Sequence, residues 1–292
     1  DRKVNIVFNY NIIIRGGIMV KKLISVLLIA ILALTVVGCS QESKEDSTNT
    51  GEEAEVIKIG VTPEPHGKIV ELIKDDLEKE GIQVEIVEFT DYVTPNQALA
   101  DGDLDANFFQ HEPYLNDFIK ENNLDLVSIG SIHVEPMGLY SSKYESIDQL
   151  EDGAEIAIPN DATNGGRALL LLEKAGLIKL DEDAGILATE NDIVENPKNL
   201  KFTPLEAAQL PRVLQDVDGA VINGNYALEA GLVPTKDSIL LEDKDSPYAN
   251  IVAVRKGEEN EEKFKKLMEA LQSDEVRQFI EENYEGGVIP AF

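Results

Sequence analysis

The chain has 292 residues, of which 26 are basic and 55 are acidic, and its formal net charge is −29 at neutral pH. So negative a protein repels nucleic acid and anionic lipid, which excludes both as expected partners. Hydrophobic residues make up 43% of the chain and recur at regular spacing, so the sequence indicates a folded protein rather than a disordered one.

The first distinctive stretch is an apolar run over residues 23–37, which follows Lys21 and Lys22. The run is short for a membrane-spanning helix, and its basic front and small residue at the end, Gly38, are typical of a signal peptide. Cys39, the single cysteine of the chain, comes next. This junction resembles the lipobox of bacterial lipoproteins, in which the cysteine is lipidated and becomes the new N-terminus. The alternative is a membrane-anchor helix with an incidental cysteine.

Residues 19–38 are therefore predicted to be a lipoprotein signal peptide. Residues 1–18 do not suit such a signal and are predicted to be an over-extension of the gene; a real extension would yield a peptide in mass spectrometry. From Cys39 onwards the chain has 254 residues, with 21 basic and 54 acidic residues and a formal charge of −33. Residues 39–55 are polar and predict a flexible tether. Because no second cysteine is present, an intrachain disulfide is excluded and core packing must stabilise the fold.

Strands and helices alternate from residue 56 onwards. The run at residues 56–61 is rich in β-branched residues and predicts a strand, and Ile69, Ile73 and Leu77 follow at the spacing of a buried helix face. Further strands are expected at residues 82–89, 104–109, 126–132 and 137–140, and helices up to about residue 80 and at 96–100 and 112–121.

The same alternation repeats in the second half of the chain. Strands are expected at residues 154–158, 200–203, 220–222, 239–241 and 251–255, and helices at 165–175, 206–214 and 225–230, with two closing helices around 264–271 and 276–280. The pattern predicts an α/β fold whose sheets are mostly parallel and covered on both faces. Two such units predict two lobes with a cleft between them. A ligand is then expected beyond the carboxyl ends of the strands.

Arg167 is the first candidate for binding at such a strand end. It follows Gly165 and Gly166, which would let backbone N–H groups approach an anion at the start of a helix. A guanidinium there can bind a carboxylate through two parallel hydrogen bonds, so Arg167 is a candidate carboxylate clamp. The alternative is an ordinary surface arginine.

Asn223 ends the apolar strand at residues 220–222, and an amide there can bind an ammonium and a carboxylate at once. The alternative for Asn223 or Asn225 is a helix N-cap. Phe108 and Phe109 are adjacent in a strand and therefore point to opposite faces, so at most one is expected to reach the cleft. Aromatic rings suit an apolar or thioether side chain, and core packing is the alternative.

The three histidines, His66, His111 and His133, all fall in predicted turns near glutamates, which leaves a metal site open as an alternative. No pair of them has helical spacing, and no metal or other cofactor is predicted. The sequence contains no nucleophile elbow and no phosphate-binding loop, and Cys39 is assigned to lipidation. No catalytic residue is therefore expected.

Five stretches together resemble a known family, the methionine-binding lipoproteins of the MetQ/NlpA type. They span residues 60–66, 91–96, 105–115, 164–169 and 221–227. The resemblance extends from residue 56 to residue 292, and the lipobox agrees with it. It implies a two-lobed fold of the type II periplasmic-binding-protein class and a lipid anchor on the extracytoplasmic face of the membrane. The implied function is delivery of methionine to the permease and ATPase subunits of an ABC importer.

Carried over by position, the resemblance also implies a set of ligand-binding residues. Arg167 would hold the ligand carboxylate, and Asn164 and Asn223 its polar end. The side-chain pocket would be lined by Tyr92, Phe109, His111 and Tyr114. His66, Glu135 and Asn225 complete the expected site.

Three alternatives stay open for the function. The protein could bind another amino acid or a methionyl dipeptide, it could be an enzyme on a similar fold, or it could be a metal-binding lipoprotein. The first lobe is expected to take residues 56–141 and 249–292, and the second lobe residues 142–248. The chain would therefore cross between the lobes twice.

Overall fold

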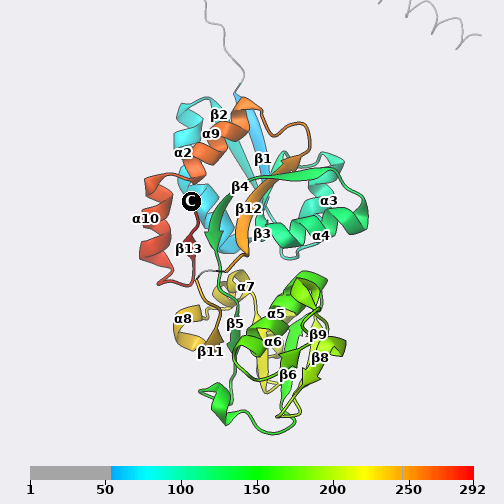
Figure 1. Cartoon of the computed structure of the whole chain (residues 1–292). Coiled ribbons are helices and arrows are strands. Elements are labelled where there is room, and N and C mark those ends of the chain that lie inside the picture. Colours follow the sequence, from blue (N-terminus) through cyan, green and yellow to red (C-terminus); the bar gives the residue numbers. More distant parts are fainter. Residues whose placement is uncertain (1–53, 245) are drawn as a thin grey trace, which may run out of the picture. The chain divides into compact units, whose positions relative to one another are not determined.

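The computed structural model describes residues 54–244 and 246–292 (Figure 1). The chain divides into two units, residues 1–52 and residues 53–292, and the described residues all belong to the second. The expected signal peptide, Cys39 and nearly all of the expected tether lie outside the described residues. Among the helices in the described part, none is both long and apolar enough to cross a membrane.

The first lobe is built on a sheet with the strand order β13-β4-β12-β3-β1-β2. Its strands are β1 (Glu55–Val61), β2 (Ile82–Glu88), β3 (Ala106–His111), β4 (Leu126–Val134), β12 (Ala249–Arg255) and β13 (Ile289–Pro290). β1 pairs in parallel with β2 and β3, whereas β12 runs antiparallel to both β3 and β4. β13 runs antiparallel to β4.

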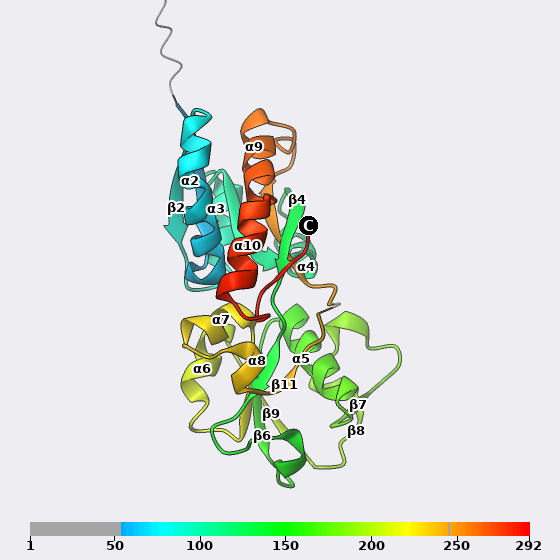
Figure 2. The ribbon, with the colours of Figure 1, turned by 90° about the vertical axis from the view of Figure 1, so that its left-hand side faces the viewer.

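Helices cover both faces of this sheet. They are α2 (Lys68–Lys79), α3 (Thr94–Asp101), α4 (Glu112–Asn122), α9 (Glu262–Leu271) and α10 (Asp274–Asn283). Ile69, Ile73 and Leu77 of α2 are buried in one core with residues of α9 and α10, as the four-residue spacing predicted. Figures 1 and 2 show α9 and α10 beside α2, so both ends of the described chain build this lobe. A second core lies under α3 and α4.

The second lobe is built on a sheet with the order β11-β5-β10-β6-β9. Its strands are β5 (Gly138–Tyr140), β6 (Glu155–Pro159), β9 (Lys201–Leu205), β10 (Gly219–Ile222) and β11 (Ser238–Leu241), and its helices include α5 (Ala162–Lys174), α6 (Leu210–Val213), α7 (Gly224–Glu229) and α8 (Pro234–Asp237). β6 pairs in parallel with β9 and β10, and β5 runs antiparallel to β10 and β11.

Both sheets are thus mixed, and the expectation of mostly parallel sheets is wrong. The reason lies in the two connections between the lobes. β4 and β11 run toward the junction and lead into the other lobe, so β5 and β12, which come next, start at the junction and run away from it. A strand that begins at the cleft must run antiparallel to strands that end at the cleft.

The two connections span residues 135–137 and 242–248, between β4 and β5 and between β11 and β12. β5 pairs within the second sheet, so the chain leaves the first lobe a few residues before the expected boundary after residue 141. The chain enters the first sheet again with β12, which begins at Ala249.

Several short elements were not predicted, because two to four residues give no measurable period. They include the small sheet of β7 (Lys179–Leu180) and β8 (Ile193–Glu195), as well as α8 and β13. The helix expected at residues 206–214 is a 3₁₀ turn, Ala207–Gln209, followed by the short α6.

Candidate functional site

A small pocket lies where the carboxyl ends of β3, β6 and β10 meet the two connections between the lobes. It is lined by Tyr92, Phe109, Gln110, His111, Tyr114, Glu135, Asn164, Arg167, Asn223, Gly224, Asn225 and Asn250. Nine of the ten predicted ligand-binding residues are among them, and His66 is the exception. The sequence reasoning missed Gln110, Gly224 and Asn250. The site therefore forms at the strand ends where a ligand was expected.

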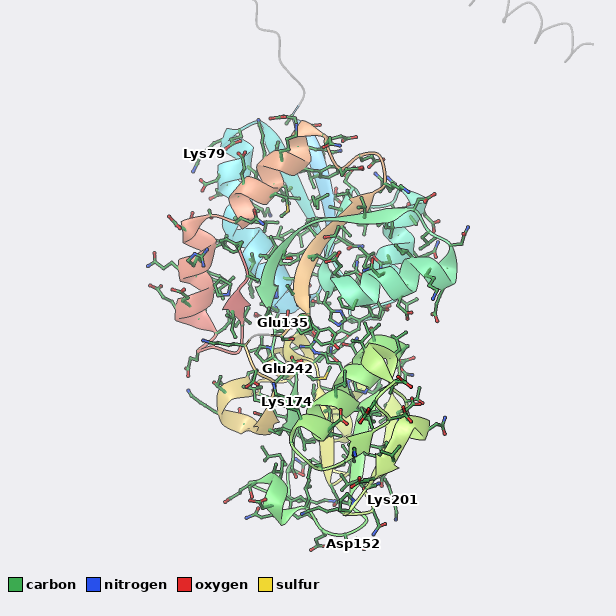
Figure 3. All side chains as sticks on the ribbon, in the orientation of Figure 1. Lys79, Glu135, Asp152, Lys174, Lys201 and Glu242 are labelled. Carbon is green, nitrogen blue, oxygen red and sulfur yellow. The ribbon has the colours of Figure 1, made fainter. Side chains whose placement is uncertain are left out.

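Arg167 is almost completely buried, with 3% of its surface exposed. Its Nε donates to Oε1 of Glu242 over 3.1 Å, and its Nη2 donates to Oε2 of the same carboxylate. Nη2 also donates to the backbone oxygen of Glu135 over 2.8 Å. The ring of Tyr248 lies against the guanidinium, with 4.3 Å between Cζ and the ring centroid. Figure 3 shows Glu135 and Glu242 at the level where the lobes meet.

The helix start before Arg167 differs from the prediction. α5 begins at Ala162 rather than at residue 165, which places Arg167 in its second turn. Asp161 caps the helix, and its Oδ1 accepts from the backbone N–H of Asn164 over 2.9 Å. Because a carboxylate of the protein already occupies this N-terminus, the expected role of the helix start in binding an anion is wrong. The guanidinium itself is the cationic group that faces the pocket.

The amides and His111 form one hydrogen-bonded chain across the lobes. Nδ1 of His111 accepts from the backbone N–H of Tyr114 over 3.1 Å, so its proton is on Nε2, which donates to Oδ1 of Asn164 over 3.1 Å. The same oxygen accepts from Nδ2 of Asn223 over 2.8 Å. Oδ1 of Asn223 is buried and has no hydrogen-bond partner among the described residues. The pocket thus contains an acceptor that is ready for a donor on a ligand.

Three aromatic rings that line the pocket lie close to one another. The ring centroids of Tyr92 lie 6.0 Å from Phe109 and 5.9 Å from Tyr114, and those of Phe109 and Tyr114 lie 6.3 Å apart. Phe108 is fully buried in the core of the first lobe, as the alternation along the strand predicted. The hydroxyl of Tyr92 donates to Oδ1 of Asn225 over 2.5 Å and links the two lobes. Asn225 lies inside α7, and the N-cap position of that helix is held by Asn223, whose side chain makes no capping hydrogen bond.

His66, His133 and Glu135 form a buried cluster beside the pocket. Oε1 of Glu135 lies 2.7 Å from Nε2 of His133 and 3.3 Å from Nε2 of His66. Nε2 of His66 also lies 3.0 Å from Oδ1 of Asn250, and its Nδ1 lies 2.7 Å from Oγ1 of Thr62. His66 does not line the pocket and instead holds Asn250, which does.

The structure does not assemble the three-histidine site that the sequence left open. His111 belongs to the amide chain, and only His66, His133 and Glu135 come close enough to share one ion in the described part of the chain. Nε2 of His133 hydrogen-bonds to Oε1 of Glu135, whereas Nδ1 of His133 is buried and has no hydrogen-bond partner among the described residues. Burial raises the pKa of the Glu135 carboxyl, while the nearby His66 opposes that shift.

Burial of the three histidines predicts acid sensitivity of the fold. Burial lowers the pKa of His66 to about 4 and those of His111 and His133 to about 3, from an ordinary value of 6.5. As the pH falls below 6.5, the unfolded chain binds protons that the folded chain does not, so the free energy of unfolding decreases. Each histidine contributes up to about 1.4 kcal/mol per pH unit. Burial also raises the pKa of the Glu229 carboxyl to about 7 and raises the pKa values of Glu135 and Asp161. These three shifts act in the opposite direction and offset part of the effect.

Chemical unfolding at about pH 7.5, 6 and 5 would measure this dependence. The measurements belong in about 1 M salt, which screens the repulsion among the many acidic residues that protonation would otherwise relieve. We expect the unfolding midpoint to decrease steadily toward pH 5. A midpoint that does not change over this range would contradict neutral histidines in the folded state.

The fold and site together define a class: two-lobed α/β binding proteins that enclose a small ligand at the junction of their lobes. A comparison with known proteins identifies the group within that class. The chain belongs to the NlpA lipoprotein family, whose profile matches residues 57–292. The match covers nearly all of the described residues.

Individual relatives support the same assignment. The chain is 48% identical over 260 residues to the D-methionine-binding lipoprotein MetQ of Salmonella typhimurium, covering 88% of this chain and 93% of that protein. It is 43% identical over 261 residues to the membrane lipoprotein TpN32 of Treponema pallidum, covering 89% and 94%. Among solved structures it is similar to a nutrient-binding protein from Burkholderia cenocepacia bound to methionine. The TM-score is 0.79 and the identity 50%, over 81% of this chain and all of that one.

Proposed function

We propose that this protein binds methionine at the pocket between its lobes and delivers it to the permease of an ABC importer. The observation that carries the proposal is the pairing of a buried guanidinium, Arg167, with the aromatic wall of Tyr92, Phe109 and Tyr114. A zwitterionic amino acid with an apolar side chain needs groups of these two kinds at opposite ends. Relatives at this level of identity are named for methionine binding, which supports the choice of ligand.

In the proposed complex, Arg167 holds the carboxylate of methionine through Nη1, which makes no hydrogen bond to any other described residue. The unpaired Oδ1 of Asn223 accepts from the ammonium group, and Asn164 fixes that amide. The thioether lies among the rings, where sulfur–aromatic contacts contribute about 0.3–1.5 kcal/mol each. Asn225 holds Tyr92 in place, and Asn250 completes the polar end of the pocket.

The free volume at the centre of the pocket is about 20 Å³, close to the smallest space that holds one water molecule. Methionine therefore cannot enter unless the lobes separate. Ligand contacts from both lobes then favour the closed arrangement, and the two connections at residues 135–137 and 242–248 are the segments that must bend. The bond between Tyr92 and Asn225 and that between His111 and Asn164 are made only in the closed state.

We further propose that residues 19–38 are removed as a signal peptide and that Cys39 carries the lipid anchor. Residues 39–55 would tether the two lobes to the extracytoplasmic face of the membrane, next to the permease and ATPase subunits. The relatives named as lipoproteins support this arrangement. Mass spectrometry of the protein purified from its membrane would identify a diacylated N-terminal peptide that starts at Cys39. A peptide from residues 1–18 would contradict the assignment.

Calorimetry of the unfolded and refolded protein tests the proposed ligand, because refolding removes any bound amino acid. L-methionine, D-methionine and methionyl dipeptides are titrated in parallel, with leucine as the matched ligand that lacks sulfur. We expect one methionine per chain and a weaker response to leucine. If only dipeptides bind, the ligand is a methionyl dipeptide and not free methionine. If none of these ligands binds, the proposed function is refuted.

The same purified protein can be used to test the two alternative functions, an enzyme and a metal-binding lipoprotein. An enzyme would return a changed product, so recovery of the intact amino acid after prolonged incubation counts against catalysis. A metal-binding lipoprotein would carry about one ion per chain in elemental analysis. Loss of that ion after chelation would then have to change the fold or the binding of methionine.

A further inference from the structure

We propose that Glu242 is a positioning residue that sets the preference of the pocket for a ligand with a free carboxylate. This inference rests on the proposed function, because it assigns how Arg167 is held for that ligand. Glu242 follows the last residue of β11 and belongs to the connection that returns to the first lobe. The family resemblance and the strand-end reasoning gave it no role.

The contact between Glu242 and Arg167 is bidentate and buried. Nε and Nη2, which form one edge of the guanidinium, donate to the two oxygens of the Glu242 carboxylate. The glutamate side chain is 14% exposed and that of the arginine 3%. Oε2 also accepts from the backbone N–H of Met137 over 3.2 Å. Met137 belongs to the other connection between the lobes, so this one carboxylate ties both connections to Arg167.

Glu242 does not compete with the ligand for space. It is absent from the pocket lining but lines a second hollow with Tyr248 and Lys174, and Arg167 lines both spaces. Glu242 takes the edge formed by Nε and Nη2, which leaves Nη1, with no hydrogen bond to another described residue, for the ligand. Tyr248 covers one face of the guanidinium at 4.3 Å, so its plane is fixed as well.

A pre-positioned guanidinium favours binding because it is ordered before the ligand arrives. An arginine side chain that is already ordered loses little conformational entropy when it takes up a carboxylate. Glu242 also supplies the counter-charge of this buried guanidinium, so Arg167 can stay in place before a ligand arrives. Without Glu242, Arg167 would have to be ordered by the ligand itself. Removal of Glu242 should therefore lower the affinity for ligands that carry a carboxylate.

Glu242→Gln keeps the shape of the side chain and removes its charge and one acceptor oxygen. Asp243→Asn is the matched control, because it removes an equal charge one residue along. Asp243 is exposed and pairs with Lys174 rather than with Arg167. The ligands are L-methionine and L-methioninol, which keeps the thioether and the ammonium group but has no carboxylate. Calorimetry measures the affinity for L-methionine. The ligand-dependent rise in Tm measures the affinity for L-methioninol, which is expected to bind more weakly.

We expect Glu242→Gln to lower the affinity for L-methionine about tenfold to a hundredfold. This is the effect expected when one charge-assisted hydrogen bond is lost. The affinity for methioninol should change by less than about threefold. Asp243→Asn should leave both ligands unchanged. If Glu242→Gln does not fold, Glu242→Asp replaces it, because the shorter side chain keeps the charge and cannot span both nitrogens. We expect Glu242→Asp to show the same selective loss for methionine, of smaller size.

Other outcomes overturn the inference. Equal weakening of methionine and methioninol would mean that Glu242 only maintains the fold. Tighter methionine binding in Glu242→Gln would mean that the glutamate competes with the ligand. Unchanged methionine binding would remove Glu242 from the site. Wild-type protein that binds neither ligand would refute the proposed function and this inference together, whereas wild-type binding with an unaffected variant refutes the inference alone.

Discussion

Replacement of Arg167 by alanine should lower the affinity for L-methionine at least about a hundredfold. The variant loses the charge-assisted hydrogen bonds to the ligand carboxylate, each of which contributes about 1.5–3 kcal/mol. It also leaves the largely buried carboxylate of Glu242 without its partner, so that its negative charge repels the carboxylate of the ligand. Calorimetry of refolded protein measures the change directly.

Arg212→Ala is the matched control, because Arg212 is an exposed arginine of the second lobe and lies outside the pocket. It should bind methionine as the wild type does. Arg167→Lys should recover only part of the affinity, since an ammonium group is a point charge that cannot replace the planar fork. Near-normal affinity in a folded Arg167→Ala variant would show that the carboxylate is bound elsewhere.

The parts of the fold that follow from local pattern could be predicted. Ile69, Ile73 and Leu77 recur at the period of a helix face and are buried on that face. Alternation along a strand separated Phe108 from Phe109, and the structure places the first in the core and the second at the pocket. The position of strand ends in such a fold indicated Arg167 and Asn223 as candidates, whereas Tyr92, Tyr114 and Asn164 were expected only from the family resemblance.

The rest of the site depends on contacts that no local pattern records. Arg167 and Glu242 are 75 residues apart, and they meet because the chain crosses between the lobes beside β11. The same crossing places Asn250 at the pocket. One signal could have indicated Asn250, a single polar residue at the start of the apolar run 251–254, next to the expected return between the lobes. The opposite direction of β5 and β12 has the same origin.

The two glycines before Arg167 were predicted to admit an anion, but the structure explains them by packing. A Cβ atom added to Gly166 would lie 2.3 Å from the backbone oxygen of Ile186 and 3.0 Å from the backbone nitrogen of Ala188. A Cβ atom added to Gly165 would lie 2.9 Å from the backbone oxygen of Pro159. Glycine at both positions therefore lets α5 lie directly against neighbouring backbone, which fixes where Arg167 emerges from the helix.

Gly166→Ala should consequently destabilise the fold by about 2–3 kcal/mol, because the atoms in its way are backbone atoms that cannot rotate aside. The higher helix propensity of alanine offsets about 1 kcal/mol of a larger steric cost. Tm should decrease by about 4–12 °C for a chain of this size, as measured by circular dichroism.

Gly67→Ala is the matched control for this prediction. Gly67 is also a buried glycine at a helix start, but a Cβ atom there would meet nothing closer than 3.4 Å, from the backbone oxygen of Thr62. Its Tm should therefore decrease much less than that of Gly166→Ala. Because Arg167 follows Gly166 directly, the displaced helix should also weaken methionine binding in the folded fraction of the variant. Equal stability of the two variants would mean that α5 can move away from residues 186–188 at no cost, and the close backbone approach would then not be what positions Arg167.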